Sequence, residues 1–560
     1  IHRGALDAEF VFDDLVHIVE RERDIAAPEA SVAWLLGTQR PVVKLSLAAN
    51  HAWGGIDPWG YHLVNLAIHA AVTVLVYLAV RLGATRLRAR GAISADATRT
   101  DLVAFGTAAL WALHPLTTAA ATYVVQRAES LAAMFTLLAA LLLMRAAAGA
   151  RAWSRPACVG CVLLALLSKP TAVGAPLALL ALDAFVLEGS LREALRRRWA
   201  LHAANLALVA VPLSLGIGEG IFGGDGRIAG YGAGVLGATP LSYALSQVRA
   251  LGLYLAMCVD PARMSIDHGM ESLAPPLMLV LGVAGGAACL VGIVAGWRRG
   301  AWWTVVPAAF VALLAPTTSI VPLADPAADQ RMYLPLALVS LACAAVLIGR
   351  PRRATVAAAC MVAVLAAVAL ESRATLARIA KYRDSVRLWD DVVELRPAHA
   401  RGFVNRAMLL VSRGELDRAE PDIGRAEQIQ PGNPDVMFLR AVLDMRAGRA
   451  SEALERLDVV ATATVADARV YGLRGDAMRA LGRHADAAQA YRNAAKRAPS
   501  EARYLALAGR AALDAGDTAG ALAAFEAALA ADPTLAEAGL GLAEARSRGA
   551  ALQEAPTDGR

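Results

Sequence analysis

The chain of 560 residues is 57% apolar and 19% charged, and its mean hydropathy is +0.46. These values exclude an ordinary soluble protein, a disordered chain and collagen, because so large an apolar excess has to be buried in lipid. Six cysteines in a chain of this length exclude a disulfide framework. The net charge of +6 comes almost wholly from arginine, which indicates membrane topology and not nucleic-acid binding.

Apolar runs follow one another up to about Leu370 and then stop. Runs of this length predict membrane-spanning helices. We expect about ten spans, at residues 61–82, 102–118, 131–148, 157–168, 172–187, 201–217, 276–297, 301–320, 333–349 and 354–371. The chain starts at Ile1 without Met, and a start in the cytoplasm would require one further helix before this residue.

Arginines fill every second connection between the expected spans. Because positive charge marks the cytoplasmic side of a membrane protein, these connections are expected in the cytoplasm. The other side then holds residues 1–60, the stretch around 114–129, the turn at Lys169, residues 218–275, residues 316–332 and everything after residue 371.

After residue 371 the sequence repeats itself every 34 residues. The repeated positions are Gly414, Gly448, Gly482 and Gly516, then Ala419, Ala453, Ala487 and Ala521, and the large residues Trp389, Ile423, Leu457, Tyr491 and Phe525. This spacing predicts four tetratricopeptide repeats, at 401–434, 435–468, 469–502 and 503–536, after a leading half-repeat that ends at Pro397. A stack of such repeats presents a concave surface to a peptide or protein, although a spacer or dimerisation module fits the same pattern.

The expected fold class is therefore all-α, with a polytopic membrane helix bundle followed by an α-solenoid. We divide the chain into a membrane domain at 1–371, a connecting helix and half-repeat at 372–400, and a repeat domain at 401–550. Residues 551–560 are expected to form a disordered tail.

Polar residues gather on the side opposite to the arginine-rich connections, where they are costly unless they have a function. They include Asp13, Asp14, Arg40, Lys44, His62, His69, His114, Arg127, Glu129, Lys169, Asp267, His268, Asp329, Arg331 and Tyr333. Asp13 and Asp14 can supply a general base, although a helix cap or a solvated turn fits this pair about equally well. His114 precedes a proline, so it is interpreted either as a hydrogen-bonding helix end or as a catalytic acid.

The cations on this side can converge on a phosphate or pyrophosphate leaving group, although each alone is more often a topology residue. They are Arg40, Lys44, Arg127, Lys169 and Arg331. Cys158 and Cys161 have no second cysteine pair nearby, so they fit core residues better than a zinc site. The chain has no Walker loop, GxGxxG, HExxH or GxSxG motif in a matching context, which argues against nucleotide hydrolysis, hydride transfer and peptidase chemistry.

The order of several motifs resembles that of the transmembrane and tetratricopeptide-repeat (TMTC) O-mannosyltransferase-like proteins. These motifs are Phe10-Val11-Phe12-Asp13-Asp14, Arg40-Pro41, Tyr61-His62 through His69, Leu113-His114-Pro115, Val125-Gln126-Arg127-Ala128-Glu129, Ser168-Lys169-Pro170, Pro316 through Pro322, and Arg331-Met332-Tyr333-Leu334-Pro335. Together with the repeats, the resemblance covers nearly the whole chain. Pro170 and Gln330 depart from it, because the family usually has an acidic residue and a His at these positions.

The resemblance implies a GT-C glycosyltransferase fold of the bacterial type, in which an Asp of the first outer loop acts as the base. We carry this role to Asp13 and Asp14, with a slight preference for Asp14. The residues implied in binding the donor phosphate or sugar are Arg40, His114, Arg127, Glu129, Lys169, Arg331 and Tyr333. No cofactor is required, and a divalent metal on the paired carboxylates is compatible with the chemistry.

The implied reaction moves a sugar from a polyprenyl-phosphate carrier, with inversion, to an acceptor hydroxyl group, most simply a Ser or Thr of a secreted or membrane protein that the repeats bind. The implied location is the bacterial inner membrane, with the repeats in the periplasm. Three alternatives remain open at this point. They are transfer to an envelope glycan or lipid, a non-catalytic scaffold for envelope assembly, and a transporter, which would need ionisable residues near the middle of the spans.

Overall fold

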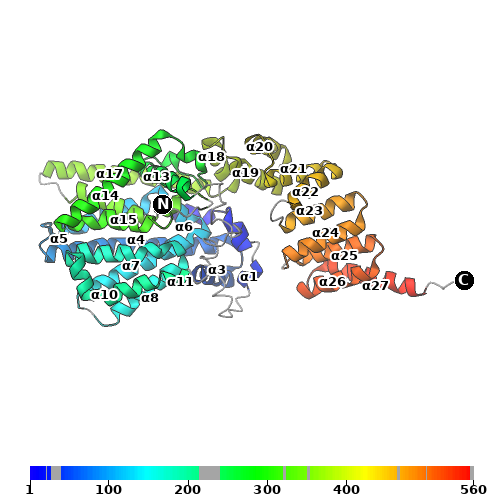
Figure 1. Cartoon of the computed structure of the whole chain (residues 1–560), viewed down its shortest axis with the longest axis horizontal. Coiled ribbons are helices and arrows are strands. Elements are labelled where there is room, and N and C mark those ends of the chain that lie inside the picture. Colours follow the sequence, from blue (N-terminus) through cyan, green and yellow to red (C-terminus); the bar gives the residue numbers. More distant parts are fainter. Residues whose placement is uncertain are drawn as a thin grey trace. The chain divides into compact units, whose positions relative to one another are not determined.

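The computed structural model describes residues 1–19, 22–26, 40–149, 151–212, 240–318, 323, 325–349, 354–462, 467–499 and 501–554. Every secondary-structure element in these residues is helical, as the sequence predicts (Figure 1). The chain divides into two compact units, Ile1–Arg396 and Pro397–Arg560. The first unit therefore extends beyond the last apolar run and includes α17 (Ala354–Lys381) and α18 (Ser385–Leu395).

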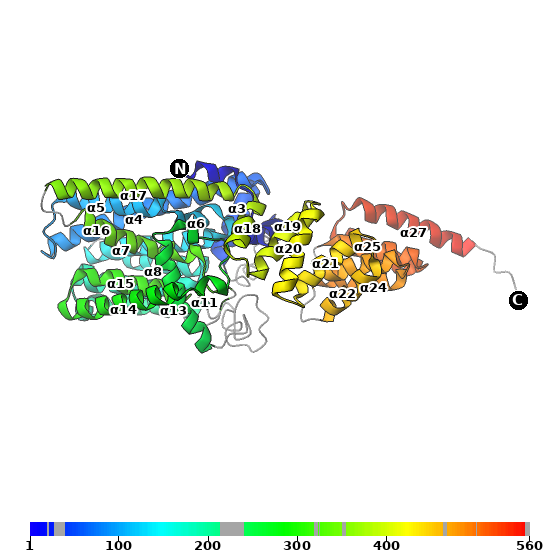
Figure 2. The same ribbon diagram turned by 90° about the horizontal axis from the view of Figure 1, so that it is seen from above.

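Five helical stretches among the described residues of the first unit are long and apolar enough to cross a membrane. They are α4 (Pro58–Ala89), α7 (Arg127–Ala147) with the short η4 (Val124–Gln126), η5 (Pro170–Gly174) with α9 (Ala175–Ala181) and η6 (Leu182–Glu188), α14 (Pro276–Arg299), and α17. Figure 2 shows α17 lying along α5 and α4, and α5 (Ala97–Leu113) contacts both. Three shorter apolar stretches belong to the same unit, α8 (Ser154–Ser168), η11 (Trp302–Thr304) with α15 (Val305–Leu314), and α16 (Pro335–Leu347). The number of about ten crossings stays a prediction.

A further apolar stretch is bent, so it fits either a broken span or a re-entrant loop. Helix α5 stops at Leu113, and the chain continues through η3 (Pro115–Thr117) and α6 (Thr118–Thr122) at an angle of 59° to α5. Pro115 has no N–H group to continue the helix, and the ring nitrogen Nδ1 of His114 accepts the N–H of Leu116 instead. The bend turns Thr118–Gln126 inward, so this outer loop becomes a buried part of the bundle.

Helix α10 (Leu191–Ala207) covers the first residues of the span expected at 201–217. It is kinked at Arg198, whose backbone angles are φ −138° and ψ 27°. Arg198 forms a bidentate pair with the buried Asp183, and His202 contacts the same carboxylate at 2.7 Å. Residues 213–217 of the expected span lie outside the described residues.

Helix α13 (Pro240–Met257) lies within residues 218–275, which we had interpreted as an outer connection. Ser, Gln and Arg side chains interrupt its apolar run, so the sequence did not reveal this helix, and the side of the membrane on which residues 218–275 lie stays a prediction. Helix α13 crosses α14 closely at two glycines. A Cβ atom on Gly252 would lie 1.8 Å from the carbonyl oxygen of Met278, and one on Gly282 would lie 1.8 Å from that of Val248.

The second unit is the predicted solenoid. Its helix pairs are α19 (Ala400–Ser412) and α20 (Leu416–Ile429), α21 (Pro434–Arg446) and α22 (Ala450–Thr462), α23 (Ala468–Ala480) and α24 (His484–Arg497), and α25 (Ala502–Asp514) and α26 (Thr518–Ala531), followed by α27 (Ala536–Glu554). The repeated glycines end the first helix of each pair with a positive φ, for example 77° at Gly414. Gly475 has no side chain and so leaves room for the ring of Tyr491. A Cβ atom at this position would lie only 2.6 Å from the ring. The 34-residue spacing therefore reflects helices that touch at the same points in each repeat.

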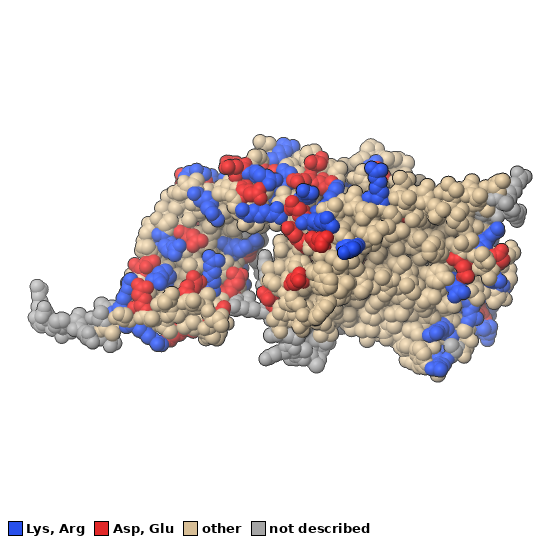
Figure 3. All heavy atoms as spheres, turned by 180° about the vertical axis from the view of Figure 1, so that it is seen from behind, with Lys and Arg blue, Asp and Glu red and all other residues tan. Residues whose placement is uncertain are grey.

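The surface of the first unit agrees with a membrane environment. Figure 3 shows a broad expanse of uncharged atoms on one face of this unit, with charged side chains gathered at its end. Only 11% of the apolar window of α14 and 6% of that of α17 is buried within the structure. Apolar helices that expose so much of their surface need lipid around them.

Candidate active site

The first fourteen residues carry the two acids that the sequence singles out. Short helix η1 (His2–Asp7) leads into an extended stretch, and the π-helical turn η2 (Leu15–Val19) follows Asp14. Between them Phe12 has a positive φ of 49°, which is strained for a residue with a large side chain. Aromatic packing holds this conformation, because Phe10 contacts Tyr61 and Phe12 contacts Trp389, with ring centroids 5.3 and 5.2 Å apart.

Asp14 is completely buried and accepts three backbone hydrogen bonds. Its Oδ1 accepts from the N–H of Val125 (2.7 Å), and its Oδ2 accepts from Val11 (3.1 Å) and Val124 (3.3 Å). Burial raises the pKa of Asp14 to about 8, although the three backbone donors act in the opposite direction. Both oxygens therefore hold the start of η4 against the N-terminal segment.

Asp13 has different surroundings. It is partly exposed, and its backbone N–H donates to the hydroxyl oxygen of Tyr123 at 3.0 Å. Burial raises the pKa of the Asp13 carboxyl group, while a hydrogen bond with the Tyr123 side chain and the charges of His17 and Arg40 lower it, and the charge of Asp325 raises it further. A partly exposed carboxylate with a raised pKa has the properties of a general base.

The cations Lys169 and Arg331 lie at one small cavity. Lys169 forms an ion pair with Glu129, and these two residues line a cavity of about 40 Å³ together with Arg331 and Thr317. The ammonium group of Lys169 interacts electrostatically with Arg40 as well as with Arg331. The charge of Arg40 also acts on the pKa of Asp13, and we refer to Asp13, Arg40, Lys169, Glu129 and Arg331 as the charged cluster, of which Lys169, Glu129 and Arg331 line the same cavity.

The loop that carries Arg331 is held by α13 and by an ionic network. Arg331 donates to the carbonyl oxygens of Asp325 (2.7 Å) and Pro326 (3.3 Å), and Gln247 of α13 also donates to Pro326 (3.2 Å). Two residues before Arg331, Asp329 accepts hydrogen bonds from Arg378 of α17 and from Nε2 of His268. The loop that carries Arg331 is thus held by Gln247 of α13, Arg378 of α17 and His268.

This network extends to the end of the first unit. Although burial opposes it, the charge of Arg378 and the hydrogen bond from His268 hold the pKa of Asp329 below its ordinary value. Nδ1 of His268 accepts from Arg396 at 3.0 Å. His268 and Asp329 stand out in the sequence, whereas Arg378 and Arg396 do not, because no local pattern connects residues so far apart in the chain.

Three of the residues assigned to donor binding use their polar atoms in hydrogen bonds with other protein groups. Arg127 is buried, and it donates to Asn65 Oδ1 (2.6 Å), to the Tyr61 carbonyl oxygen (2.9 Å) and to the carbonyl and hydroxyl oxygens of Ser46 (3.1 and 3.3 Å). Nδ1 of His114 accepts the N–H of Leu116, and its Nε2 contacts the carbonyl oxygen of Cys258 at 3.2 Å.

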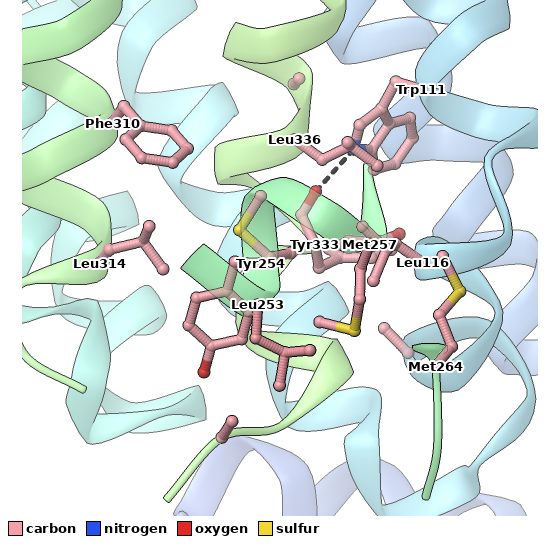
Figure 4. Close-up of a cluster of buried hydrophobic side chains, with 14 of the residues drawn as sticks. Trp111, Leu116, Leu253, Tyr254, Met257, Met264, Phe310, Leu314, Tyr333 and Leu336 are labelled. Carbon is pink, nitrogen blue, oxygen red and sulfur yellow. Dashed lines mark hydrogen bonds between the residues drawn. The ribbon is translucent and has the colours of Figure 1, made fainter. Parts of the chain in front are cut away.

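Tyr333 is the third such residue, and it belongs to the hydrophobic core. Its hydroxyl group contacts Nδ1 of His69 at 2.9 Å, and its carbonyl oxygen accepts from Trp111 Nε1 at 2.6 Å. Figure 4 shows this second hydrogen bond among buried side chains that include Leu116 and Met257. The surroundings of Arg127, His114 and Tyr333 indicate that they support the bundle around the cluster.

A cavity of about 770 Å³ lies inside the bundle. It is lined mainly by apolar side chains from α4, α7, α9, α15 and α16. Thr136, Leu313 and Leu334 line this apolar cavity and the small polar cavity as well. The two cavities are therefore neighbours, and the cations of the small cavity lie beside the apolar lining of the large one. Among the described residues, no three His, Cys, Asp or Glu side chains gather to hold a metal ion, and a divalent metal stays a prediction.

Comparisons with known proteins find tetratricopeptide repeats and relatives named O-mannosyl-transferases. Residues 375–434 and 473–536 match one tetratricopeptide-repeat family model, and residues 410–477 match a second. Over 133 residues the chain is 35% identical to protein O-mannosyl-transferase TMTC2 of Mus musculus, a match that covers 22% of this chain and 14% of that protein. It is 32% identical over 151 residues to protein O-mannosyl-transferase TMTC4 of Homo sapiens, covering 24% of this chain and 20% of that protein. The matches thus span only 14 to 20% of the length of these two relatives.

Solved structures resemble the chain more distantly. The TPR protein YrrB, described as having an unusual peptide-binding site, is 18% identical, with a TM-score of 0.26, and the match covers 29% of this chain and 83% of YrrB. Yeast Tom70 is 13% identical, with a TM-score of 0.27, and the match covers 86% of this chain and 96% of Tom70.

Proposed function

We propose that the chain is a GT-C type glycosyltransferase that moves a sugar from a polyprenyl-phosphate carrier to a hydroxyl group on the non-cytoplasmic side of a membrane. The observation that carries the proposal is the pair of cations Lys169 and Arg331 at a small cavity that adjoins an apolar cavity of about 770 Å³. The matched relatives named O-mannosyl-transferases support a transferase, and they make mannose the first sugar to test.

The donor fits the two neighbouring cavities. Its prenyl chain would occupy the apolar cavity between α4, α7 and α16, where burial from water favours it. Its phosphate would lie at Lys169 and Arg331, at the polar end of that cavity. The Glu129 carboxylate fixes the Lys169 ammonium group in advance, so the cation would not have to be ordered when the donor binds.

The chemistry then needs one base and a stabilised leaving group. Asp13 removes the proton from the acceptor hydroxyl, and the resulting oxygen attacks the anomeric carbon from the side opposite to the phosphate. The bond between the anomeric carbon and the phosphate oxygen breaks, so the configuration inverts and polyprenyl phosphate leaves. Arg40, Lys169 and Arg331 stabilise the charge on that phosphate, which removes the need for a second acid.

We assign the base to Asp13 and not to Asp14, the acid slightly preferred from the sequence. Both oxygens of Asp14 already accept backbone hydrogen bonds in a fully buried position, whereas Asp13 is partly exposed. We also leave Arg127, His114 and Tyr333 out of the donor site because protein groups use their hydrogen-bonding atoms.

The acceptor would be a Ser or Thr of a secreted or membrane protein, which the repeats would hold near the membrane and so concentrate. The arginine-rich connections favour a location of the cluster and the repeats on the non-cytoplasmic side, which is the periplasm if the membrane is a bacterial inner membrane. Transfer to an envelope glycan or lipid would use the same donor cluster.

The test uses the purified full chain in lipid nanodiscs with polyprenyl-phosphate mannose and a Ser/Thr-containing acceptor peptide. We expect product and polyprenyl phosphate to form in equal amounts. Asp13→Asn should lower the rate about 10²-fold or more, the usual contribution of a general base, while donor binding is unchanged. A rate for Asp13→Asn equal to that of the unmodified chain would overturn the assignment of the base. No turnover of polyprenyl-phosphate sugars by the unmodified chain would favour the scaffold instead.

A further inference from the structure

Tyr123 lies where the bent stretch returns to the core, between α6 and η4. Its side chain is 3% exposed, so its position is fixed by packing. Its hydroxyl oxygen accepts the N–H of Asp13 at 3.0 Å, and the same hydroxyl lowers the pKa of the Asp13 carboxyl group. One buried hydroxyl group thus fixes the backbone of the proposed base and acts on its carboxylate.

Val124 and Val125, which follow Tyr123, contact Asp14 through their backbone and not through the Tyr123 side chain. The backbone N–H groups of Val124 and Val125 donate to Asp14, so they fix the segment independently of the Tyr123 hydroxyl. Removing that hydroxyl should leave the Asp14 contacts and the ring packing intact. The contact between Tyr123 and Asp13 can therefore be tested separately from the fold.

We propose that Tyr123 is a positioning residue that orients the Asp13 carboxylate toward the acceptor hydroxyl. The inference rests on the proposed function, since it assigns Asp13 the role of base. Asp13 follows Phe12, whose positive φ is strained, so its orientation is not the one that the backbone would choose alone. A hydrogen bond from the Asp13 N–H to the hydroxyl of a buried, rigid ring helps to supply that orientation at little cost in side-chain entropy.

The hydroxyl also affects when Asp13 is ionised. The charged groups that act on Asp13 are His17 of η2, Arg40 before α3 (Pro41–Gly54), and Asp325 of the loop before Arg331. The Tyr123 hydroxyl stabilises the charged carboxylate, and so it lowers the pKa that burial raises. Without the hydroxyl the pKa of Asp13 should rise. On acidification the carboxylate would then be protonated at a higher pH, and activity would be lost there.

The experiment compares Tyr123→Phe with Tyr61→Phe in the full chain, using polyprenyl-phosphate mannose as the donor. Tyr61 is a matched control because its ring packs in the same core but its hydroxyl donates to the Gly55 carbonyl oxygen. For Tyr123→Phe we expect kcat to fall about tenfold, the loss of one well-oriented hydrogen bond, with donor KM unchanged. The acidic limb of the pH profile should move to higher pH. Tyr61→Phe should change neither.

A second variant keeps the hydroxyl. A fluorotyrosine at position 123 is a stronger hydrogen-bond donor, so it should move the acidic limb to lower pH even if Tyr123→Phe fails to fold. Unchanged kcat and pH profiles in the folded Tyr123 variants, with Asp13→Asn inactive, would overturn the positioning role and leave the proposed function in place. An active Asp13→Asn would instead remove the function on which the inference rests.

Discussion

Asp13 and Asp14 are adjacent in the chain, but their surroundings differ because their partners come from a segment 110 residues away. The sequence predicted that this pair belongs to a polar cluster, and it did not separate the two roles. The same limit applies to the cations. Arg127 is as prominent in the sequence as Arg331, and only the fold pairs it with Asn65.

The role of Asp14 predicts a loss of stability. Asp14→Asn replaces one acceptor oxygen by an NH₂ group, which would face the backbone N–H groups of Val11, Val124 or Val125. A buried donor left without an acceptor costs about 1–3 kcal/mol, so the free energy of unfolding should fall by about this amount. Thermal unfolding in detergent measures it, with Asp13→Asn as the control of similar volume and charge change. Equal midpoints for the two variants would contradict the structural role.

The two arginines should respond differently to substitution. Arg331→Gln should raise donor KM about tenfold or more, the loss expected for a charge-assisted hydrogen bond. Arg127→Gln should lower thermal stability because buried acceptors of Asn65 and Tyr61 lose their donor, while the folded fraction keeps its donor KM. Donor titrations of the folded fraction distinguish the two effects. A larger KM effect for Arg127→Gln would return that residue to the donor site.

At the scale of elements, the repeats were predictable and α13 was not. Contacts within and between tetratricopeptide repeats recur at fixed spacing, so small residues such as Ala419 and Ala453 mark them in the sequence. Helix α13 lacks such a repeat, and its polar residues serve distant partners, as Gln247 does at Pro326. Its helical character depends on packing against α14, which no local pattern records.

The close crossing of α13 and α14 gives a direct test. Gly252→Ala would place a Cβ atom 1.8 Å from the carbonyl oxygen of Met278, so the helices must separate. Overpacking of this kind costs about 1–3 kcal/mol, and thermal unfolding should report it. Gly286→Ala in α14 is the control, because its Cβ atom would lie 3.8 Å from the nearest atom, which belongs to Leu251. Equal stability of the two variants would contradict the crossing.

Helix α18 belongs to the unit that carries the acids, although it has the register of a half-repeat. Ser385 donates its N–H and hydroxyl to Glu9 at 3.1 and 3.0 Å, and Trp389 packs on Phe12. Arg396 closes the network at His268. The boundary between units therefore follows Arg396, beyond the start of the expected half-repeat at residue 372.

These contacts predict where the chain can be shortened. Truncation after Arg396 should preserve thermal stability and donor turnover, whereas truncation after Lys381 should lower both by removing Ser385, Trp389 and Arg396. Unfolding curves and release of polyprenyl phosphate by the two truncated chains provide the comparison. Equal behaviour would show that α18 does not support the acids.

At the scale of the whole molecule, the sequence predicted an apolar helical unit followed by a solenoid, and the structure agrees. It did not predict the cavity of about 770 Å³, because residues from α4, α7, α9, α15 and α16 line it and none of these segments is unusual alone. The account depends on the relation between this cavity and the charged cluster. Shared lining by Thr136, Leu313 and Leu334 is the structural basis for that relation.

The most direct measurement is photolabelling of the full chain in nanodiscs with polyprenyl-phosphate mannose that carries a diazirine on its prenyl chain. The account predicts adducts on cavity residues such as Val80, Met144 and Leu338, which disappear when unlabelled donor is added and weaken in Arg331→Gln. Adducts confined to the exposed faces of α14 and α17, or adducts that unlabelled donor does not remove, would contradict it.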